Sequence, residues 1–338
     1  MHYRPLGRSG LRVSPLCLGT MMFGGPTPQT EALAIIAKAK EAGINFIDTA
    51  DMYQGGESEV IVGRALASDR HHWILATKAA NPTGSGPNAR GLSRRHVVHA
   101  LEASLQRLKL DHVDIFYLHK EDLETPLEET IRAVADVVRQ GKTRYFGLSN
   151  FRSWRVALVC QLCDQAGIDR PVVSQPYYNL LNRMPEVEHL PACGHFGLGV
   201  VPYSPLARGV LTGKYTPDQA PGADTRAGRQ DKRMLETEWR PESLAIAQTL
   251  KAHAEATGRT PIQFAVAWLL HHRLVSAVIA GPRTLEQWRA YMAALEATCD
   301  AADEALVDGL VPPGHPSTPG YSDPAYPLEG RLIHRRVR

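Results

Sequence analysis

Short runs of apolar and β-branched residues alternate along the chain with longer segments whose apolar residues recur at helical spacing. Eight runs have the character of strands: 16–19, 44–48, 73–77, 113–118, 144–148, 172–175, 199–203 and 275–280. Helix-like segments follow most of them: 31–42, 57–67, 93–108, 127–140, 154–166, 185–195 and 285–297. This alternation is typical of parallel βαβ units.

Several of the strand-like runs are apolar on both faces, as strands of a barrel covered by helices must be. An open doubly wound sheet is the alternative architecture. In its dinucleotide-binding form it carries G-x-G-x-x-G after the first strand, whereas this first run leads into GTMMFGG at 19–25, which has a different spacing. The eightfold repeat therefore favours an α/β fold of the (β/α)₈ TIM-barrel type, with its site at the carboxyl ends of the strands.

Three stretches fall outside the repeat. Residues 1–12 contain a Gly-Arg-Ser-Gly turn and predict a hairpin that caps the bottom of the barrel. Residues 215–241 form a long polar loop after the seventh strand, which is typical of a lid or binding loop. Residues 312–327 contain six prolines and predict an extended tail, with Tyr321 and Tyr326 over either the barrel mouth or the outer surface. We expect a single domain over 1–338, divided into hairpin 1–12, barrel 13–311 and tail 312–338.

Composition narrows the class of protein. The 338 residues include 38 Lys+Arg and 35 Asp+Glu, a net charge of +3, with no basic stripe that would suggest a nucleic-acid partner. The longest strongly apolar run, 264–270, is too short to span a membrane, and the N-terminus lacks the apolar segment of a signal peptide. Five cysteines are an odd number, so no disulfide framework is indicated and a cytoplasmic location is expected.

Two patterns invite a metal or redox interpretation. Cys160 and Cys163 form a C-x-x-C, but they lie in a helical pattern without a second cysteine pair, which favours a buried structural role over redox or zinc chemistry. Histidine pairs at 71–72 and 271–272 lack Asp, Glu or Cys companions at ligand spacing. We therefore expect no metal site.

Polar residues end three successive strands of the predicted barrel. Asp48 closes the second run and Tyr53 follows it, while Lys78 and His119 occupy the ends of the third and fourth runs. Each has a structural explanation when taken alone, such as helix capping or a buried histidine. Together they suggest an active site, because barrel stability requires none of them at this rim.

Seven motifs occur in order along the chain. They are GTMMFG at 19–24, FIDTADMYQGGESEVIVGRAL at 46–66, ILATK at 74–78, DIFYLH at 114–119, GLSNF at 147–151, QPYYNLLNR at 175–183 and PYSPLARGVLTGKY at 202–215. Over roughly residues 3–297 the chain resembles the aldo-keto reductase superfamily. The resemblance implies a (β/α)₈ barrel, an extended nicotinamide cofactor that is usually NADPH, and hydride transfer to an aldehyde or ketone.

The reaction needs a proton donor for the carbonyl oxygen. Tyrosine has a pKa of about 10, and a neighbouring ammonium stabilises the phenolate and is expected to lower that value. Lys78 supplies this charge, Asp48 holds Lys78, and His119 orients the substrate oxygen. The resemblance assigns the same roles, with Tyr53 as the acid.

Cofactor contacts are expected from two groups of residues. Ser149, Asn150 and Gln175 end the fifth and sixth strands and are suited to fix the nicotinamide carboxamide, while Tyr203 is suited to stack on the ring. The resemblance implies a diphosphate loop downstream, in which glycines allow close backbone approach. The expected cofactor residues are Gly19, Thr20, Asp48, Ser149, Asn150, Gln175, Tyr203, Ser204, Leu206, Gly209, Leu211, Gly213, Lys214, Arg226, Gly281, Arg283 and Gln287.

Preference for NADPH requires cations near the ribose 2′-phosphate. Arg226 and Arg283 are the candidates, so NADPH is the expected cofactor and NADH the alternative. Gly281 and Gln287 match the family pattern of this region, whereas Tyr291 stands where the family often has Asn, which leaves the adenine contacts open.

The expected substrate pocket is mostly apolar, which favours aromatic or medium-chain carbonyls. It comprises Met21, Met22, Phe23, Met52, Tyr53, His119, Phe151 and the loop 81–92.

A second function class is a cofactor-binding regulatory subunit with little turnover, since the family includes potassium-channel β-subunits. A lyase or hydrolase would need a metal cluster or carboxylate pair that the sequence lacks. The oligomeric state stays open.

Overall fold

Eight parallel strands form the centre of the molecule. The computed structural model describes residues 1–217 and 219–328. The strands are β3 (Leu16–Gly19), β4 (Phe46–Asp48), β5 (Ile74–Ala79), β6 (Val113–Leu118), β7 (Thr143–Ser149), β8 (Val173–Gln175), β9 (Gly199–Val200) and β10 (Val278–Ala280), in the order β10-β3-β4-β5-β6-β7-β8-β9.

The two edge strands meet, so the sheet closes on itself. The Val200 amide donates to the Leu274 carbonyl at 3.0 Å, and the Ser276 amide donates to the Val200 carbonyl at 2.9 Å. The Ile279 amide donates to the Pro202 carbonyl at 3.1 Å. The predicted (β/α)₈ barrel is therefore confirmed.

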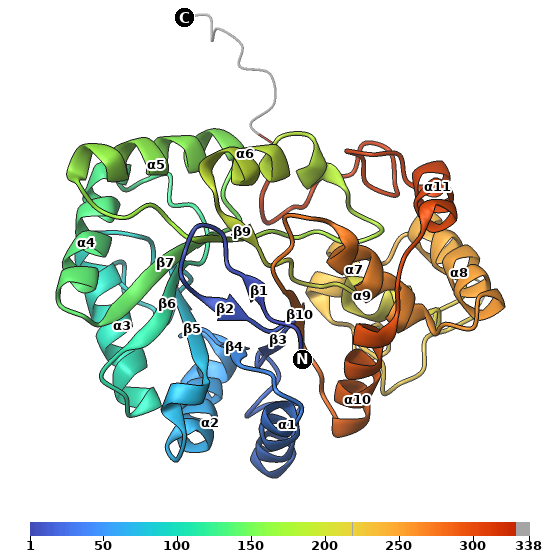
Figure 1. The fold of residues 1–338 in the computed structure, drawn as a ribbon, viewed down its shortest axis with the longest axis horizontal. Coiled ribbons are helices and arrows are strands. Elements are labelled where there is room, and N and C mark those ends of the chain that lie inside the picture. The colour runs from blue at the N-terminus through green and yellow to red at the C-terminus, as the bar shows by residue number, and fades with distance from the viewer. Residues whose placement is uncertain (218, 329–338) are drawn as a thin grey trace, which may run out of the picture.

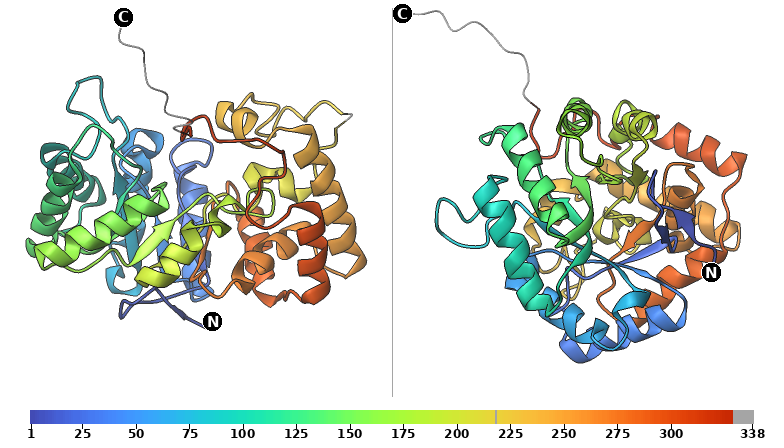
Figure 2. Two further views of the ribbon diagram at one scale, coloured as in Figure 1. Left: turned by 90° about the horizontal axis from the view of Figure 1, so that it is seen from above. Right: turned by 60° about the vertical axis from the view of Figure 1, so that its left-hand side comes forward.

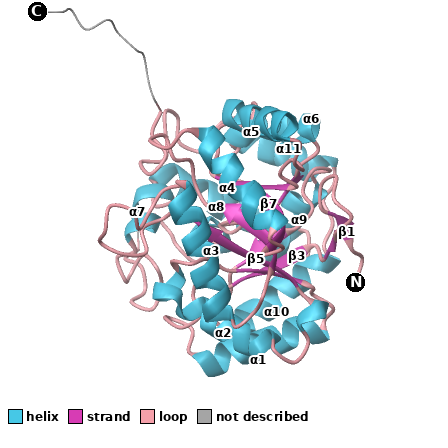
Figure 3. Cartoon of the chain, turned by 90° about the vertical axis from the view of Figure 1, so that its left-hand side faces the viewer, coloured by secondary structure: helices cyan, strands magenta, loops and turns pink. Residues whose placement is uncertain are grey.

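Helices surround the strands, as Figures 1 and 3 show. Those that follow predicted strands are α1 (Gln29–Glu41), α2 (Glu57–Leu66), α3 (Arg94–Leu108), α4 (Leu127–Arg139), α5 (Ser153–Ala166), α6 (His189–Phe196) and α10 (Leu285–Ala293). Strand side chains alternate between two apolar clusters. Cys17, Phe46 and Ile115 fill the barrel interior, whereas Leu16 and Ile47 pack beneath the helices.

Four helices lie outside the predicted helical segments: α7 (Lys232–Thr237), α8 (Pro241–Ala256), α9 (Pro261–His271) and α11 (Ala301–Leu310). Local signals for two of them are present in the sequence. Pro241 opens α8, and α9 has Pro261 at its first position with a capping box between Thr260 and Gln263.

The hairpin of β1 (Arg4–Pro5) and β2 (Arg12–Val13) covers the amino-terminal end of the barrel (Figure 1). Arg4 donates to the carbonyls of Leu270 and Val275 at 2.9 and 3.1 Å, and the Ser276 hydroxyl donates to the Pro5 carbonyl at 2.8 Å. The hairpin closes this end of the barrel and leaves the carboxyl ends of the strands for the site.

The tail crosses the opposite end of the barrel, over its described residues 312–328 (Figure 2). Both carboxylate oxygens of Asp323 accept hydrogen bonds from Arg233, at 2.9 and 2.6 Å, and Arg152 donates to the Pro327 carbonyl at 2.9 Å. Tyr326 lines the cavity at the barrel mouth. Residues 329–338 of the predicted tail lie outside the described residues, and the division of 1–338 into parts of one domain stays a prediction.

No helix in residues 1–217 or 219–328 combines the length and the apolar character that a membrane span needs.

Candidate active site

A cavity of about 560 Å³ opens at the carboxyl ends of the strands. Part of its lining consists of the strand-end residues Asp48 and His119 together with Tyr53. Its lining also includes the basic residues Lys214, Arg226 and Arg283, here called the basic part of the lining. The same cavity is therefore lined by residues of the predicted reaction centre and of the predicted phosphate site.

Lys78 is the centre of a buried polar cluster below this cavity. Its ammonium donates to the Asp48 carboxylate, to the Thr49 carbonyl at 2.7 Å and to the Tyr53 hydroxyl at 3.1 Å. The Lys78 side chain has no solvent exposure. Its three donors are thus all satisfied, and the short 3₁₀ turn η1 (Tyr53–Gly56) holds the Tyr53 hydroxyl against it.

The electrostatics of this cluster favour a charged lysine and a protonated tyrosine. Burial alone lowers the pKa of Lys78, but Asp48 and Tyr53 outweigh it and raise the pKa to about 12. Burial raises the pKa of Tyr53 above its ordinary value, and Lys78 offsets that rise only in part. This differs from the sequence-based expectation of a lowered pKa, because the loss of solvent around the phenol outweighs the ammonium.

His119 stands beside Tyr53 as a neutral imidazole. The two rings meet edge to face with centroids 5.9 Å apart. Burial, with Lys78 and Lys120 adding to it, lowers the pKa of His119 well below its ordinary value. Its Nδ1 is buried and has no hydrogen-bond partner among the described residues. A neutral ring that donates one hydrogen bond is suited to orient a carbonyl oxygen.

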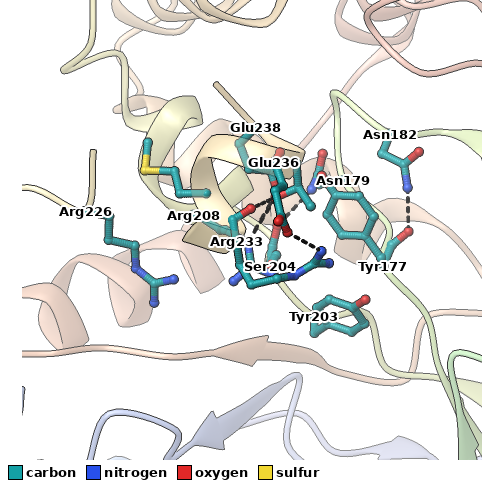
Figure 4. A network of polar contacts seen from close by, with 12 residues as sticks. Tyr177, Asn179, Asn182, Tyr203, Ser204, Arg208, Arg226, Arg233, Glu236 and Glu238 are labelled. Atoms are coloured by element: carbon teal, nitrogen blue, oxygen red, sulfur yellow. Dashed lines mark hydrogen bonds and ion pairs between the residues drawn. The ribbon is translucent and has the colours of Figure 1, made fainter. Parts of the chain in front are cut away.

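The amide side chains predicted for the nicotinamide form a connected network. Gln175 donates to Asp48 at 3.0 Å, and the Ser149 hydroxyl donates to the Gln175 carbonyl at 3.0 Å. The Tyr203 hydroxyl donates to the Asn150 amide oxygen at 2.8 Å. Tyr177 stacks on Tyr203 with ring centroids 5.7 Å apart, as Figure 4 shows from close by. The network fixes the side chains that face the cavity.

The basic part of the lining comes from the segment after β9, which carries Lys214 and Arg226, and from Arg283 after β10. Arg283 donates from its guanidinium to the Asp224 carbonyl at 3.3 Å, and its backbone amide donates to Gln287 at 2.7 Å. Arg226 lies 3.9 Å from Asp231. Several cations thus lie together, and among the described residues Asp224 is the only acidic residue in this part of the lining. Such an excess of positive charge suits a phosphate-bearing ligand.

Most predicted site residues line this one cavity. They are Gly19, Thr20, Met21, Met22, Asp48, Met52, Tyr53, His119, Ser149, Asn150, Gln175, Tyr203, Ser204, Leu206, Gly209, Lys214, Arg226, Gly281, Arg283 and Gln287. Lys78 lies directly behind Tyr53.

Besides Lys78, four predicted site residues do not line the cavity. Phe23 and Phe151 are packed in the apolar core, since their side chains turn inward from the loops that carry them. Leu211 is likewise buried, and Gly213 lies against Lys251. From the predicted loop 81–92, Asn81 alone reaches the lining.

Sequence reasoning missed three arginines of the lining, Arg208, Arg229 and Arg233. Arg208 lies inside the recognised motif at 202–215, which is a usable signal. Arg229 and Arg233 lie in the loop predicted only as a lid, where nothing in the local pattern shows which side chains turn inward.

No three His, Cys, Asp or Glu side chains of the described ranges are grouped as a metal ion would require. Cys160 and Cys163 are buried free thiols, and burial raises the pKa of Cys160 to about 11. Such thiols are poorly nucleophilic at neutral pH.

Comparisons with known proteins agree with this geometry. The model of the "Aldo/keto reductase family" matches residues 15–312. A "Probable voltage-gated potassium channel subunit beta" from Oryza sativa subsp. japonica is 38% identical over 88% of this chain and 92% of its own length. A protein of the same description from Arabidopsis thaliana is 36% identical, with the same coverage.

A third relative, "Uncharacterized oxidoreductase YrpG" from Bacillus subtilis (strain 168), is 37% identical over 95% of this chain and 100% of its own length. Together with the barrel and the family match over residues 15–312, these relatives establish the family. The chain belongs to the aldo/keto reductase family.

Proposed function

We propose that this protein reduces an aldehyde or ketone to an alcohol with NADPH, and that Tyr53 is the proton donor. The observation that carries the proposal is the Tyr53 hydroxyl, 3.1 Å from the Lys78 ammonium and beside a neutral His119, in a cavity whose lining also contains several basic residues. The proposal includes a small-molecule carbonyl as the partner and a cytoplasmic location.

The residues of the cavity fit a phosphorylated nicotinamide cofactor. Tyr203 offers an aromatic ring for the nicotinamide, and Arg226 and Arg283 offer cations for the phosphates, all three in the cavity lining. When bound, the cofactor supplies the hydride. Tyr53 then gives its proton to the carbonyl oxygen, Lys78 stabilises the phenolate that remains, and Asp48 keeps Lys78 charged and in place. His119 orients the carbonyl oxygen toward Tyr53.

The test is the loss of the reduced-nicotinamide absorbance with NADPH and a panel of aromatic and aliphatic aldehydes. We expect turnover with several aromatic or medium-chain members. Tight NADPH binding without turnover on any carbonyl would refute the reductase proposal.

Two relatives named as channel β-subunits favour a second candidate function, a cofactor-binding regulatory subunit. Native mass spectrometry distinguishes it from the first. A stable complex with another protein, together with negligible turnover, would support the regulatory function. Turnover by the isolated chain supports the enzyme.

Arg283 is expected to set part of the preference for NADPH. Replacing it (Arg283→Gln) removes a cation from the basic part of the lining and should weaken NADPH binding about tenfold while leaving NADH nearly unchanged. Titration of both cofactors by protein fluorescence measures this. Equal losses for the two cofactors would exclude a contact with the 2′-phosphate.

The tail is expected to shape the substrate end through Asp323, which is bound at both oxygens by Arg233 and lies near Tyr326 in sequence. Asp323→Asn weakens this pair and should raise the KM for aromatic aldehydes roughly threefold to fivefold. Asp164→Asn is the matched control, since Asp164 forms a two-bond pair with Arg170 on the exposed end of α5. Equal KM values for both variants would show that the tail does not contribute.

A further inference from the structure

A second cavity, of about 500 Å³, lies at the amino-terminal end of the barrel, where Pro15 precedes β3. Its walls also come from strand β1, from the last residues of α9, and from the segment that runs from the end of α10 through η5 (Ala294–Glu296) to residue 299. Among the described residues it shares no lining residue with the cavity of the proposed reaction centre. Its volume lies within the range of about 300–1,000 Å³ that is typical of small-molecule sites.

Much of the wall of this second cavity is apolar. Leu270, Met292 and Leu295 are only partly buried against the main apolar core, and each of them lines the cavity. The buried residues Pro15 and Ala294 complete this surface. Partly exposed apolar side chains around a hollow favour a ligand with an apolar body, because its binding removes their surface from water.

The described lining contains one arginine, Arg4, and no lysine. Arg4 extends from β1 and is half-buried, and one of its terminal nitrogens donates to the carbonyls of Leu270 and Val275 at 2.9 and 3.1 Å. Within residues 1–217 and 219–328 no hydrogen bond or ion pair engages its Nε or its second terminal nitrogen. Burial lowers the pKa of Arg4, since the charge has lost part of its solvent. The guanidinium is thus anchored at one nitrogen and keeps donors for a ligand.

Arg70 shows what Arg4 lacks. Arg70 is also half-buried and donates to a backbone carbonyl, that of Trp73 at 2.7 Å, but it donates to the Asp114 carboxylate at 2.7 Å as well. The acidic residue in the lining of the second cavity is Glu296, which is exposed, and in the described part of the chain no ion pair joins it to Arg4. An anion from solution would supply the missing partner of Arg4.

We propose that the second cavity binds a small-molecule carboxylate with an apolar body, such as a medium-chain fatty acid. The carboxylate accepts hydrogen bonds from Arg4, and the chain lies against Leu270, Met292 and Leu295. The remaining donors of a guanidinium suit the oxygens of one carboxylate, and the apolar wall suits the chain. The inference does not depend on the proposed function, because the two cavities are lined by different residues.

The test is isothermal titration calorimetry with octanoate as the probe, at concentrations below those at which it forms micelles. We expect one octanoate to bind per chain. Octan-1-ol lacks the charge and acetate lacks the apolar chain, so both should bind at least about tenfold more weakly. Arg4→Gln should raise the dissociation constant of octanoate roughly tenfold.

Cys299 reports independently on where octanoate binds. It lines the second cavity and is half-buried, whereas the other four cysteines are buried. Saturating octanoate should therefore slow the alkylation of Cys299 by N-ethylmaleimide several-fold, as measured by peptide mass spectrometry. The protection should be lost in Arg4→Gln at the same octanoate concentration.

Arg12→Gln is the matched control, because Arg12 is exposed on β2 of the same hairpin and lies outside the lining. It should leave octanoate binding unchanged. Arg4→Gln also removes the hydrogen bonds to two carbonyls, so circular dichroism and thermal unfolding are used to check its fold. Ala297→Trp tests the cavity with Arg4 intact: Ala297 lines it and is half-buried, so the added indole fills space and should weaken octanoate binding roughly tenfold.

Four results would overturn the proposal. The first is no octanoate binding by the wild type, and the second is equal affinity for octanoate and octan-1-ol. The third is a loss of octanoate affinity in Lys214→Gln but not in Arg4→Gln, which would place the acid in the cavity of the proposed reaction centre. The fourth is octanoate binding that neither protects Cys299 nor responds to Ala297→Trp.

Discussion

Tyr53→Phe should abolish most carbonyl reduction, with kcat falling by on the order of 10² to 10⁴. The change removes the hydroxyl that lies 3.1 Å from Lys78 and leaves the ring that meets His119 edge to face. NADPH affinity should stay within about twofold, since the contacts proposed for the cofactor do not involve this hydroxyl. Single-turnover measurements with saturating NADPH give the rate of the chemical step directly.

The matched control for this experiment is Tyr326→Phe. Tyr326 lines the same cavity, and its hydroxyl has no proposed role in proton transfer. This variant should keep kcat within a few fold of the wild type. Near-normal turnover by Tyr53→Phe would remove Tyr53 from the mechanism and direct attention to His119.

The raised pKa of Tyr53 also fixes the direction of a pH effect. Because the phenol holds its proton more strongly than free tyrosine does, reduction should persist through neutral pH and decline only on the alkaline side. Oxidation of the alcohol needs the phenolate as a base, so it should be favoured only at alkaline pH.

The position of the proposed reaction centre could be predicted from sequence because it depends on topology. In a parallel barrel the carboxyl ends of neighbouring strands meet at one rim, so residues at the ends of three successive runs must lie close together. Asp48, Lys78 and His119 are such residues. Tyr53 follows Asp48 after a short turn, so it stays close to the same rim of the barrel.

Other features depend on quantities that the sequence does not contain. Phe23 and Phe151 neighbour the site in the chain, yet their side chains fill the core, since the direction of a loop side chain depends on tertiary packing. The sign of the Tyr53 pKa shift depends on how completely the phenol is buried relative to its distance from Lys78. The ion pair of Arg233 with Asp323 joins residues that are 90 positions apart. The sequence around either residue gives no sign that the other is its partner.

A second carboxylate, Asp51, is buried close to Tyr53 in the chain. Its exposed fraction is 3%, and neither of its side-chain oxygens has a hydrogen-bond partner among the described residues. The neighbouring Glu59 is fully buried, but it accepts hydrogen bonds from Thr77 at 2.5 Å and Arg107 at 2.6 Å. Burial, with Glu59 adding to it, raises the pKa of Asp51 to about 7, against the opposing charges of Arg107 and Lys78.

This raised pKa makes Asp51 destabilising above neutral pH. Between about pH 4 and pH 7 the folded protein holds a proton on Asp51 that the unfolded chain has released, so the free energy of unfolding falls as pH rises through this window. A shift of about 3 pKa units corresponds to roughly 4 kcal/mol, lost in full above pH 7.

Asp51→Asn should therefore stabilise the protein at pH 8 by up to about 4 kcal/mol, and the gain should shrink toward zero near pH 4. Asn matches the shape of the protonated acid and has no proton to lose. Urea unfolding at pH 4, 6 and 8 measures the free energy of unfolding of both proteins. Asp169→Asn, at an exposed position before β8, is the control and should show little difference at any of these values. A gain that is equal at pH 4 and pH 8 would assign the effect to packing, and no gain at pH 8 would mean that Asp51 is stabilised as an anion in the folded state.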